Sequence, residues 1–251
     1  MASIASRRGL QALITRPREE ATALAAALAA RGVDALIEPL MEIHFRAVAS
    51  PDLTSVQAVL CTSANGVRAL ARASAERRLP LLAVGDATAE RARAEGFCSV
   101  ASAGGDAADL VRLVASRLDP REGHLLHVCG SAVADDLADD LRKRGFDVER
   151  IVLYEATPIA ALSPAATDAI RSGAVDFALF FSPRTAAIFA RLANDAGLAS
   201  GCGTMTALSI SATADAALGT LPWRRRCIAE RPEQGALLAA LDRLVAERRP
   251  D

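Results

Sequence analysis

Two different segments of this chain each occur twice, in alternating order. The first, segment A, spans residues 13–40 and has a copy, A′, at 125–154; both run from an apolar strand through a helix to an Arg-Gly pair and a second strand. The other, segment B, begins at 59–65 and has a copy, B′, at 179–185, and each leads into a helix. The order A, B, A′, B′ indicates two similar halves threaded through each other, with A pairing with B′ and B with A′.

Short apolar runs alternate with helix-period segments along the whole chain, a rhythm typical of parallel α/β layers. We expect strands near 11–15, 36–40, 57–61, 80–84, 97–101, 124–128, 149–154, 176–181, 205–210 and 226–229. We expect helices near 18–31, 64–77, 86–95, 106–118, 133–144, 164–172, 184–196, 212–218 and 233–247. The sequence therefore predicts an α/β fold of two similar doubly wound parallel-sheet domains, joined by a two-stranded connector that the chain crosses twice.

Domain boundaries follow from two extended segments that contain proline, 37–43 and 151–158. Because proline cannot donate to a sheet ladder, these segments suit exposed or edge strands. The expected domains are 1–38 with 158–251, and 44–150, with connectors at 39–43 and 151–157. Similar halves joined in this way are expected to form a cleft for a small molecule and to move relative to each other.

Composition limits the partners and the compartment. The 251 residues carry a net charge of −1 with an isoelectric point near 6.3, which argues against a nucleic-acid-binding protein. Five scattered cysteines without a C-x-x-C pair favour reduced, buried thiols over disulfides or zinc. Residues 1–10 lack a secretory apolar core, and the longest apolar run, 21–30, is too short to span a bilayer. We expect a cytoplasmic protein without membrane contact, for which a monomer is sufficient.

Small polar residues follow several predicted strands and precede helices, where free backbone N–H groups hold anions. In open parallel sheets such turns meet at the carboxyl edge. Each residue taken alone is best explained as an ordinary N-cap, but recurrence in both halves favours an anion-binding site. Arg16 and Arg184 follow such turns and are candidates for binding carboxylates, or else solvated loop arginines. The turn residues are Thr15, Thr62, Ser63, Gly85 to Thr88, Gly130, Ser131 and Ser182.

Standard catalytic signatures are absent: the sequence has no G-x-S-x-G, no Walker loop and no G-x-G-x-x-G. His124 and His127 lie at an odd offset on a predicted strand, which points their rings to opposite faces and argues against a shared metal. Tyr154, the one tyrosine, lies on a predicted crossing strand. Its phenol is either a hydrogen-bond donor and mild general acid, or a side chain packed at a hinge.

The ordered motifs resemble the uroporphyrinogen-III synthase family. Thr15-Arg16-Pro17 is similar to that family's opening T-R-P, and Glu38-Pro39-Leu40 with Ile43 is similar to its P-L-x-x-I crossing. Residues 62–67 resemble its T-S-x-N-x-V turn, 84–89 its V-G-x-x-T-A turn, 145–155 its G-x-x-V…V-Y segment and 181–183 its second S-P turn. The resemblance covers nearly the whole chain, and it is carried by the order and spacing of these short motifs.

This resemblance implies cofactor-free and metal-free cyclisation of hydroxymethylbilane to uroporphyrinogen III, with loss of its hydroxyl and inversion of ring D through a spiro intermediate. It implies catalytic roles for Tyr154, beside the departing hydroxyl, and for Thr88. The residues implied to bind the polycarboxylate substrate are Thr15, Arg16, Thr62, Ser63, Asn65, Gly85, Gly130, Ser182, Arg184 and, in a turn of ambiguous register, Ser211 or Thr213.

One departure from the family pattern supports an alternative. Cys129-Gly130 stands where many relatives have Arg-Gly, and Val133 to Asp136 stand where they have a further arginine. This loss of positive charge is compatible with compensation by Arg16 and Arg184, or with a non-catalytic tetrapyrrole- or anion-binding relative on the same scaffold. A sugar-phosphate or nucleotide enzyme is a third, weaker alternative, because the sequence lacks a phosphate loop.

Overall fold

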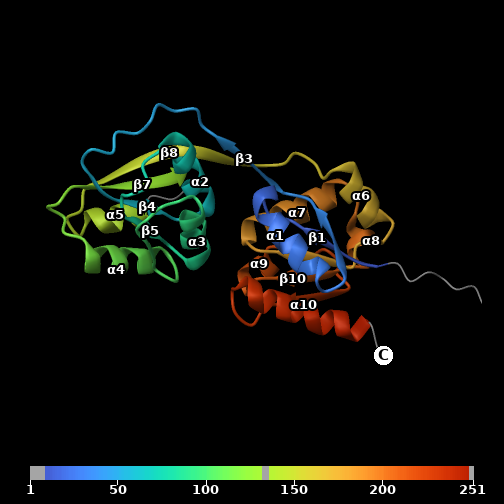
Figure 1. Ribbon diagram of the computed structural model, residues 1–251. Helices are drawn as coiled ribbons and strands as arrows, with labels where there is room; N and C mark the ends of the chain where they lie inside the picture. Colours follow the sequence, from blue (N-terminus) through green and yellow to red (C-terminus); the bar gives the residue numbers. More distant parts are fainter. Residues whose placement is uncertain (1–8, 132–135, 249–251) are drawn as a thin grey trace, which may run out of the picture. The chain divides into compact units, whose positions relative to one another are not determined.

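A computed structural model describes residues 9–131 and 136–248, and in it the chain forms two compact units (Figure 1). Unit 1 contains the chain up to Glu42 and from Pro158 onward, and unit 2 contains Ile43–Thr157. The chain therefore passes from one unit to the other twice. Both units are built from alternating strands and helices, as the predicted α/β class requires.

Unit 1 is a five-stranded parallel sheet with the order β11-β10-β9-β1-β2. Its strands are β1 (Leu10–Ile14), β2 (Val33–Ile37), β9 (Phe177–Phe180), β10 (Thr206–Ser209) and β11 (Arg225–Ile228). Its helices are α1 (Arg18–Ala29), α6 (Pro164–Arg171), α7 (Pro183–Asp195), α8 (Ala199–Cys202), α9 (Ala212–Ala216) and α10 (Gln234–Arg248).

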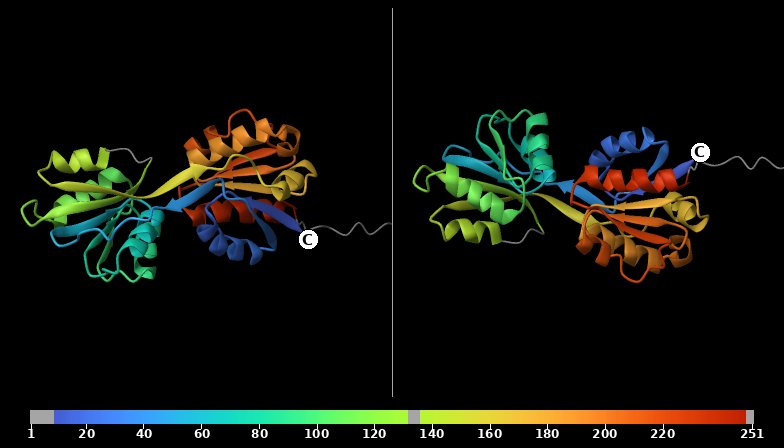
Figure 2. Two further views of the ribbon diagram at one scale, coloured as in Figure 1. Left: turned by 90° about the horizontal axis from the view of Figure 1, so that it is seen from above. Right: turned by 90° about the horizontal axis from the view of Figure 1, so that it is seen from below.

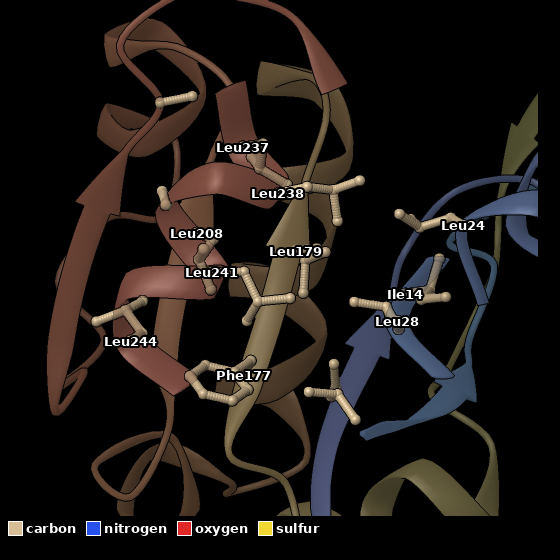
Figure 3. Close-up of a cluster of buried hydrophobic side chains, with 14 of the residues drawn as sticks. Ile14, Leu24, Leu28, Phe177, Leu179, Leu208, Leu237, Leu238, Leu241 and Leu244 are labelled. Atoms are coloured by element: carbon tan, nitrogen blue, oxygen red, sulfur yellow. The ribbon is translucent and has the colours of Figure 1, made fainter. Parts of the chain in front are cut away.

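Helices cover both faces of this sheet (Figure 2). On one face, buried leucines of α1 and α10 pack against Ile14, Phe177 and Leu179 (Figure 3). On the other, the rings of Phe180 and Phe189 meet edge to face with centroids 5.3 Å apart, which fixes α7 on β9. A sheet buried on both faces accounts for the continuous apolar runs of the strands, in place of the alternation of a half-exposed sheet.

Unit 2 contains a six-stranded sheet with the order β3-β8-β7-β4-β5-β6. Its strands are β3 (Met41–Phe45), β4 (Val56–Cys61), β5 (Leu81–Ala83), β6 (Val100–Ser102), β7 (His124–Gly130) and β8 (Val148–Pro158). The start of β3 and the last residue of β8 belong to unit 1, because the chain crosses between the units along these two strands. Its helices are α2 (Ala64–Ala73), α3 (Asp86–Ala94), α4 (Ala107–Arg117) and α5 (Asp136–Arg142). Helices α2 and α3 pack on one face of the sheet, and α4 and α5 pack on the other.

The two sheets repeat the same strand order. From β2 across to β11, unit 1 matches unit 2 read from β8 across to β6, so β1 corresponds to β7 and β9 to β4. Each sheet thus combines one A copy with one B copy, in the pairing that the sequence repeats predict. The matching Gly32 and Gly145 follow α1 and α5 with φ of 66° and 89°, a conformation that favours glycine after a helix end.

The two crossing strands run antiparallel, because Ile159 N donates to the carbonyl of Leu40 while Arg46 N donates to that of Leu153. Two details of the prediction are wrong here. The strand expected at 36–40 ends at Ile37, and β3 starts only at Met41 beyond Pro39, which has no N–H for a ladder. Strand β8 is also not an edge strand, since β3 covers it.

Within the described residues, no helix is long and apolar enough to span a lipid bilayer. The expectation that the N-terminus is not a secretory signal concerns residues that mostly lie outside the described part of the chain. The same holds for residues 133–135, which include the start of the predicted helix 133–144 and most of the segment where positive charge is lost.

Candidate functional site

The predicted site residues, with Tyr154 the exception, lie in or directly after the turns that follow parallel strands, at the carboxyl edge of each sheet. In a sheet of this order, the two central neighbouring strands lead into connections on opposite faces, and a crevice forms where their carboxyl ends separate. In unit 2 these strands are β4 and β7; in unit 1 they are β9 and β1. In unit 2 the topology therefore favours a ligand site at the turns after β4 and β7.

In unit 2 the turn after β4 forms a hydrogen bond with Tyr154 of β8. The Oγ of Ser63 lies 2.8 Å from the phenol oxygen of Tyr154, a hydrogen bond that either hydroxyl can donate. Ser63 is also the N-cap of α2, where its Oγ accepts the backbone N–H of Gly66 at 3.1 Å. Since one lone pair of Ser63 Oγ is engaged by the cap, the two hydroxyls form a short chain that starts from the N-terminus of a helix.

Two glycines allow this close arrangement. A Cβ at Gly130 would lie 2.8 Å from Cζ of Tyr154, so the ring rests on bare backbone at the end of β7. A Cβ at Gly66 would lie 3.1 Å from the carbonyl oxygen of Val128, so α2 starts close against β7. The sequence pattern placed Gly130 in the site but gave Gly66 no role.

Asn65 lies in the first turn of α2 and is half-buried. Its Oδ1 accepts a hydrogen bond of 2.7 Å from Nη1 of Arg68, a buried arginine with 7% exposure. A guanidinium held beside the turn contributes positive charge on the side of unit 2 where the family pattern indicates a loss. Arg68 was missed because it follows the motif by only a few residues; the one available signal was a cation inside the apolar run from Val67 to Leu70.

The remaining unit 2 candidates occupy the same edge. Thr62 is half-buried between β4 and Ser63. Gly85 is the N-cap of α3, and Thr88 lies in the first turn of that helix with its backbone N–H donated to the carbonyl of Gly85 at 3.1 Å. Thr88 is 7% exposed. The structure thus brings Thr88 to the predicted edge but leaves little of its side chain in contact with solvent.

In unit 1 the turn after β1 differs from its prediction. The hydroxyl of Thr15 donates to the carbonyl of Leu179 at 2.7 Å, and Thr15 is completely buried. Its side chain therefore ties β1 to β9 and is not exposed to a ligand, contrary to its assignment as a substrate-binding residue. The motif at residues 13–17 carries no signal that would reveal an inward-facing threonine.

Arg16 is held by three neighbours. Its guanidinium lies 4.4 Å above the ring of Phe181, pairs with Glu20 at 2.8 Å and donates to the Gln234 side chain at 2.9 Å. About a quarter of the Arg16 side chain, 23%, stays exposed. The stacked, paired guanidinium is a fixed cation at the carboxyl edge of unit 1, which corrects the alternative of a freely solvated loop arginine.

Ser182 repeats in unit 1 what Ser63 does in unit 2. Its Oγ is the N-cap of α7, accepts the backbone N–H of Thr185 at 3.1 Å and lies 2.9 Å from the hydroxyl of Thr185. Arg184 lies in the first turn of α7 with an exposed side chain. Both candidates therefore stand at the central carboxyl edge of unit 1.

Capping geometry settles the register of the turn at 209–214. Ser211 is the N-cap of α9, where its Oγ accepts the backbone N–H of Ala214. The equivalent N-cap in unit 2 is Gly85, which precedes α3. Counted from these caps, Thr88 corresponds to the buried Ala214, and to neither Ser211 nor Thr213. The hydroxyls of Ser211 and Thr213 lie 2.9 Å apart and bond to each other.

The cysteines are free thiols, but Cys98 is exposed and Cys227 is half-buried, contrary to the expectation of buried thiols. Burial raises the pKa of Cys61 and of Cys202 to about 12, so both stay protonated. Among the described residues, no group of three His, Cys, Asp or Glu side chains is placed to hold a metal ion.

Comparisons with known proteins show which family and which solved structures the chain is similar to. Residues 22–239 match the family described as Uroporphyrinogen-III synthase HemD. Among solved structures, uroporphyrinogen-III synthetase from Helicobacter pylori is similar with a TM-score of 0.61 at 19% identity, over 96% of this chain and 100% of that one. A mutant uroporphyrinogen III synthase from Thermus thermophilus is similar with a TM-score of 0.55 at 20% identity, over the same shares. No curated protein sequence matches the chain significantly.

Proposed function

Because the chain belongs to the uroporphyrinogen-III synthase family, we propose that it is a cyclising lyase that converts hydroxymethylbilane to uroporphyrinogen III with loss of water. The observation that carries the proposal within the structure is the hydrogen bond between Ser63 and Tyr154 at the central carboxyl edge of unit 2. This bond supports the proposal because it joins the one phenol of the chain to a turn where the topology favours ligand binding.

The first chemical step requires an acid. The C–O bond of the hydroxymethyl group breaks, the departing oxygen takes a proton and leaves as water, and the pyrrole nitrogen lone pair stabilises the remaining carbon as an azafulvene cation. In this proposal the Tyr154 phenol donates that proton. Ser63, anchored on the N-terminus of α2, keeps the phenol oxygen in place and stabilises the phenolate through its hydroxyl.

The second step requires orientation. Unaided, the bilane closes to the type I isomer, so the protein must favour attack by the substituted carbon of ring D over its free carbon. We assign this holding role to cations and helix N-termini at the carboxyl edges, acting on the substrate carboxylates. The supporting side chains are Arg16, Arg184, Arg68, Asn65 and the cap residues Ser182 and Ser211.

The proposal also covers the cofactor requirement, the compartment and the oligomeric state. The reaction needs no organic cofactor and no metal, because proton transfer and orientation are sufficient for it. A net charge of −1 and free thiols are in keeping with a cytoplasmic enzyme whose partner is its small-molecule substrate, and which acts as a monomer.

The proposal is tested by adding the protein to freshly generated hydroxymethylbilane and separating the oxidised product isomers by chromatography. Production of the type III isomer in proportion to protein concentration is the expected result. Type I alone, at the rate seen in buffer, would refute the enzymatic proposal. Tight tetrapyrrole binding in calorimetry without isomer selection would identify a non-catalytic binding protein instead.

A further inference from the structure

The register of β8 changes at the tyrosine. Strand β8 pairs with β7 residue by residue from Leu125 with Val148 to Cys129 with Val152, but Gly130 then pairs with Tyr154. Leu153 is therefore an extra residue, which makes a β-bulge at the end of the ladder.

This bulge decides which way the phenol points. Successive residues of a regular strand face opposite sides of the sheet, so an unbroken β8 would send Tyr154 to the same face as Val148, toward α4 and α5. With the extra residue, both Leu153 and Tyr154 pack in the cluster on the α2 and α3 face, at 1% and 6% exposure. The bulge thus turns the phenol toward Ser63.

The glycine opposite the bulge makes room for the ring. A Cβ at Gly130 would lie 2.8 Å from Cζ, 2.9 Å from Cε2 and 3.2 Å from the phenol oxygen of Tyr154. Gly130 is not among the glycines with positive φ, so its backbone conformation is open to other residues. The requirement for glycine here is therefore spatial, and it comes from the reactive end of the tyrosine.

Unit 1 provides an internal comparison. Its equivalent strands, β1 and β2, keep an unbroken register from Leu10 with Val33 to Ile14 with Ile37. Counted from the matching Gly32 and Gly145, Gly130 corresponds to Pro17 in unit 1. The ladder between β1 and β2 ends before this position, and the one tyrosine of the chain lies in unit 2, so the close pair of glycine and tyrosine is a feature of unit 2.

We propose that Gly130 is a positioning residue which, together with the bulge at Leu153, holds the phenol of Tyr154 on Ser63. Gly130 acts through the tyrosine and not through a contact with substrate. This inference rests on the proposed function for its catalytic consequence, but the placement of the phenol is measurable without substrate.

Because the chain contains one tyrosine, biosynthetic incorporation of 3-fluorotyrosine gives a single ¹⁹F resonance that reports on Tyr154 alone. The test variant is Gly130→Ala, and the matched control is Gly235→Ala, where a new Cβ meets no atom within 4 Å. We expect Gly130→Ala to shift the resonance, because the new Cβ displaces the ring, and Gly235→Ala to reproduce the wild-type spectrum. A folded Gly130→Ala protein with the wild-type resonance would overturn the inference.

Kinetics separate positioning from substrate binding. With the phenol displaced, kcat of Gly130→Ala should fall by about tenfold or more while KM changes by less than about twofold, because only transition-state contact is lost. Adding Tyr154→Phe should then cost little more, since the hydroxyl is already misplaced. A rise in KM at unchanged kcat would instead assign Gly130 to substrate binding and overturn the inference. If the wild-type protein makes no type III isomer, the proposed function fails while the ¹⁹F result still decides where Gly130 acts.

A second variant covers the case in which Gly130→Ala does not fold. The combination of Gly130→Ala with Tyr154→Leu removes the ring atoms that the new Cβ would meet. Recovery of the folded state by circular dichroism and thermal unfolding would show that the ring imposes the glycine. An unfolded double variant beside a folded Tyr154→Leu protein would show that something other than Tyr154 requires glycine, and would overturn the inference.

Discussion

His127 should make the stability of unit 2 depend on pH. It lies on β7 between Leu60 of β4 and Arg150 of β8, is completely buried, and neither ring nitrogen has a hydrogen-bond partner among the described residues. Burial, and to a smaller extent the positive charge of Arg150, lower the pKa of His127 from 6.5 to about 4. The perturbation we consider is a fall in pH from 8 to 5, with and without the substitution His127→Leu.

The sign follows from the direction of the pKa shift. The unfolded chain binds the proton more tightly than the folded chain, so protonation of His127 favours unfolding. Its contribution to stability is complete above about pH 7 and is lost as the pH falls from about 6.5 toward 4. A lowering from 6.5 to about 4 corresponds to about 3 kcal/mol in total, of which about 2 kcal/mol is lost by pH 5.

Urea denaturation of both proteins at pH 5 and pH 8 measures this effect. Leucine fills similar space without a titrating ring, so His127→Leu should match or exceed the wild-type free energy of unfolding at pH 8. Between pH 8 and pH 5 it should lose about 2 kcal/mol less than the wild type, because every other group titrates in both proteins. Equal losses in the two proteins would contradict the reasoning about His127.

Two further substitutions test the packing of each unit. Ser63→Ala removes the cap of α2 and should lower the free energy of unfolding by about 1 kcal/mol in urea titrations. It should also slow turnover, because the hydrogen bond to Tyr154 is lost. An unchanged free energy of unfolding together with unchanged turnover would remove Ser63 from the site. Gly201→Ala places a Cβ 2.5 Å from the carbonyl oxygen of Ile170 and should cost about 1–3 kcal/mol, seen as a lower Tm. A wild-type Tm would mean that α8 shifts away from α6 without cost.

The repeat explains why so much of the fold could be predicted from the sequence. Segments A and B each carry a strand, a polar turn and a helix, and two such copies per unit determine the central strand order β1-β9 and β7-β4. Helix α1 begins at Arg18 and α6 at Pro164, at their predicted starts, because Pro17 and Ser163 carry clear start signals. The short helix α8 was missed because Ala199–Cys202 is too brief to show a period.

The site was predictable only in part. Turns after strands identify Ser63, Ser182 and Gly85 as caps, since caps have local sequence signals. The side of the sheet toward which Tyr154 points depends on one extra residue in the register of β8. The burial of Thr15 depends on its hydrogen bond across the sheet to Leu179. Both are contacts between segments far apart in the chain, which no local pattern encodes.

The central claim is that the phenol of Tyr154, held by Ser63, is the acid that releases the substrate hydroxyl. The most direct measurement is the ratio of type III to type I isomer formed from one portion of hydroxymethylbilane by the wild type and by Tyr154→Phe at equal concentration. Phenylalanine keeps the ring packing on Gly130, so the variant should fold while its turnover falls on the order of a hundredfold. Spontaneous closure then overtakes it, and type I should dominate the products. A folded Tyr154→Phe protein that yields type III at the wild-type rate would contradict the account.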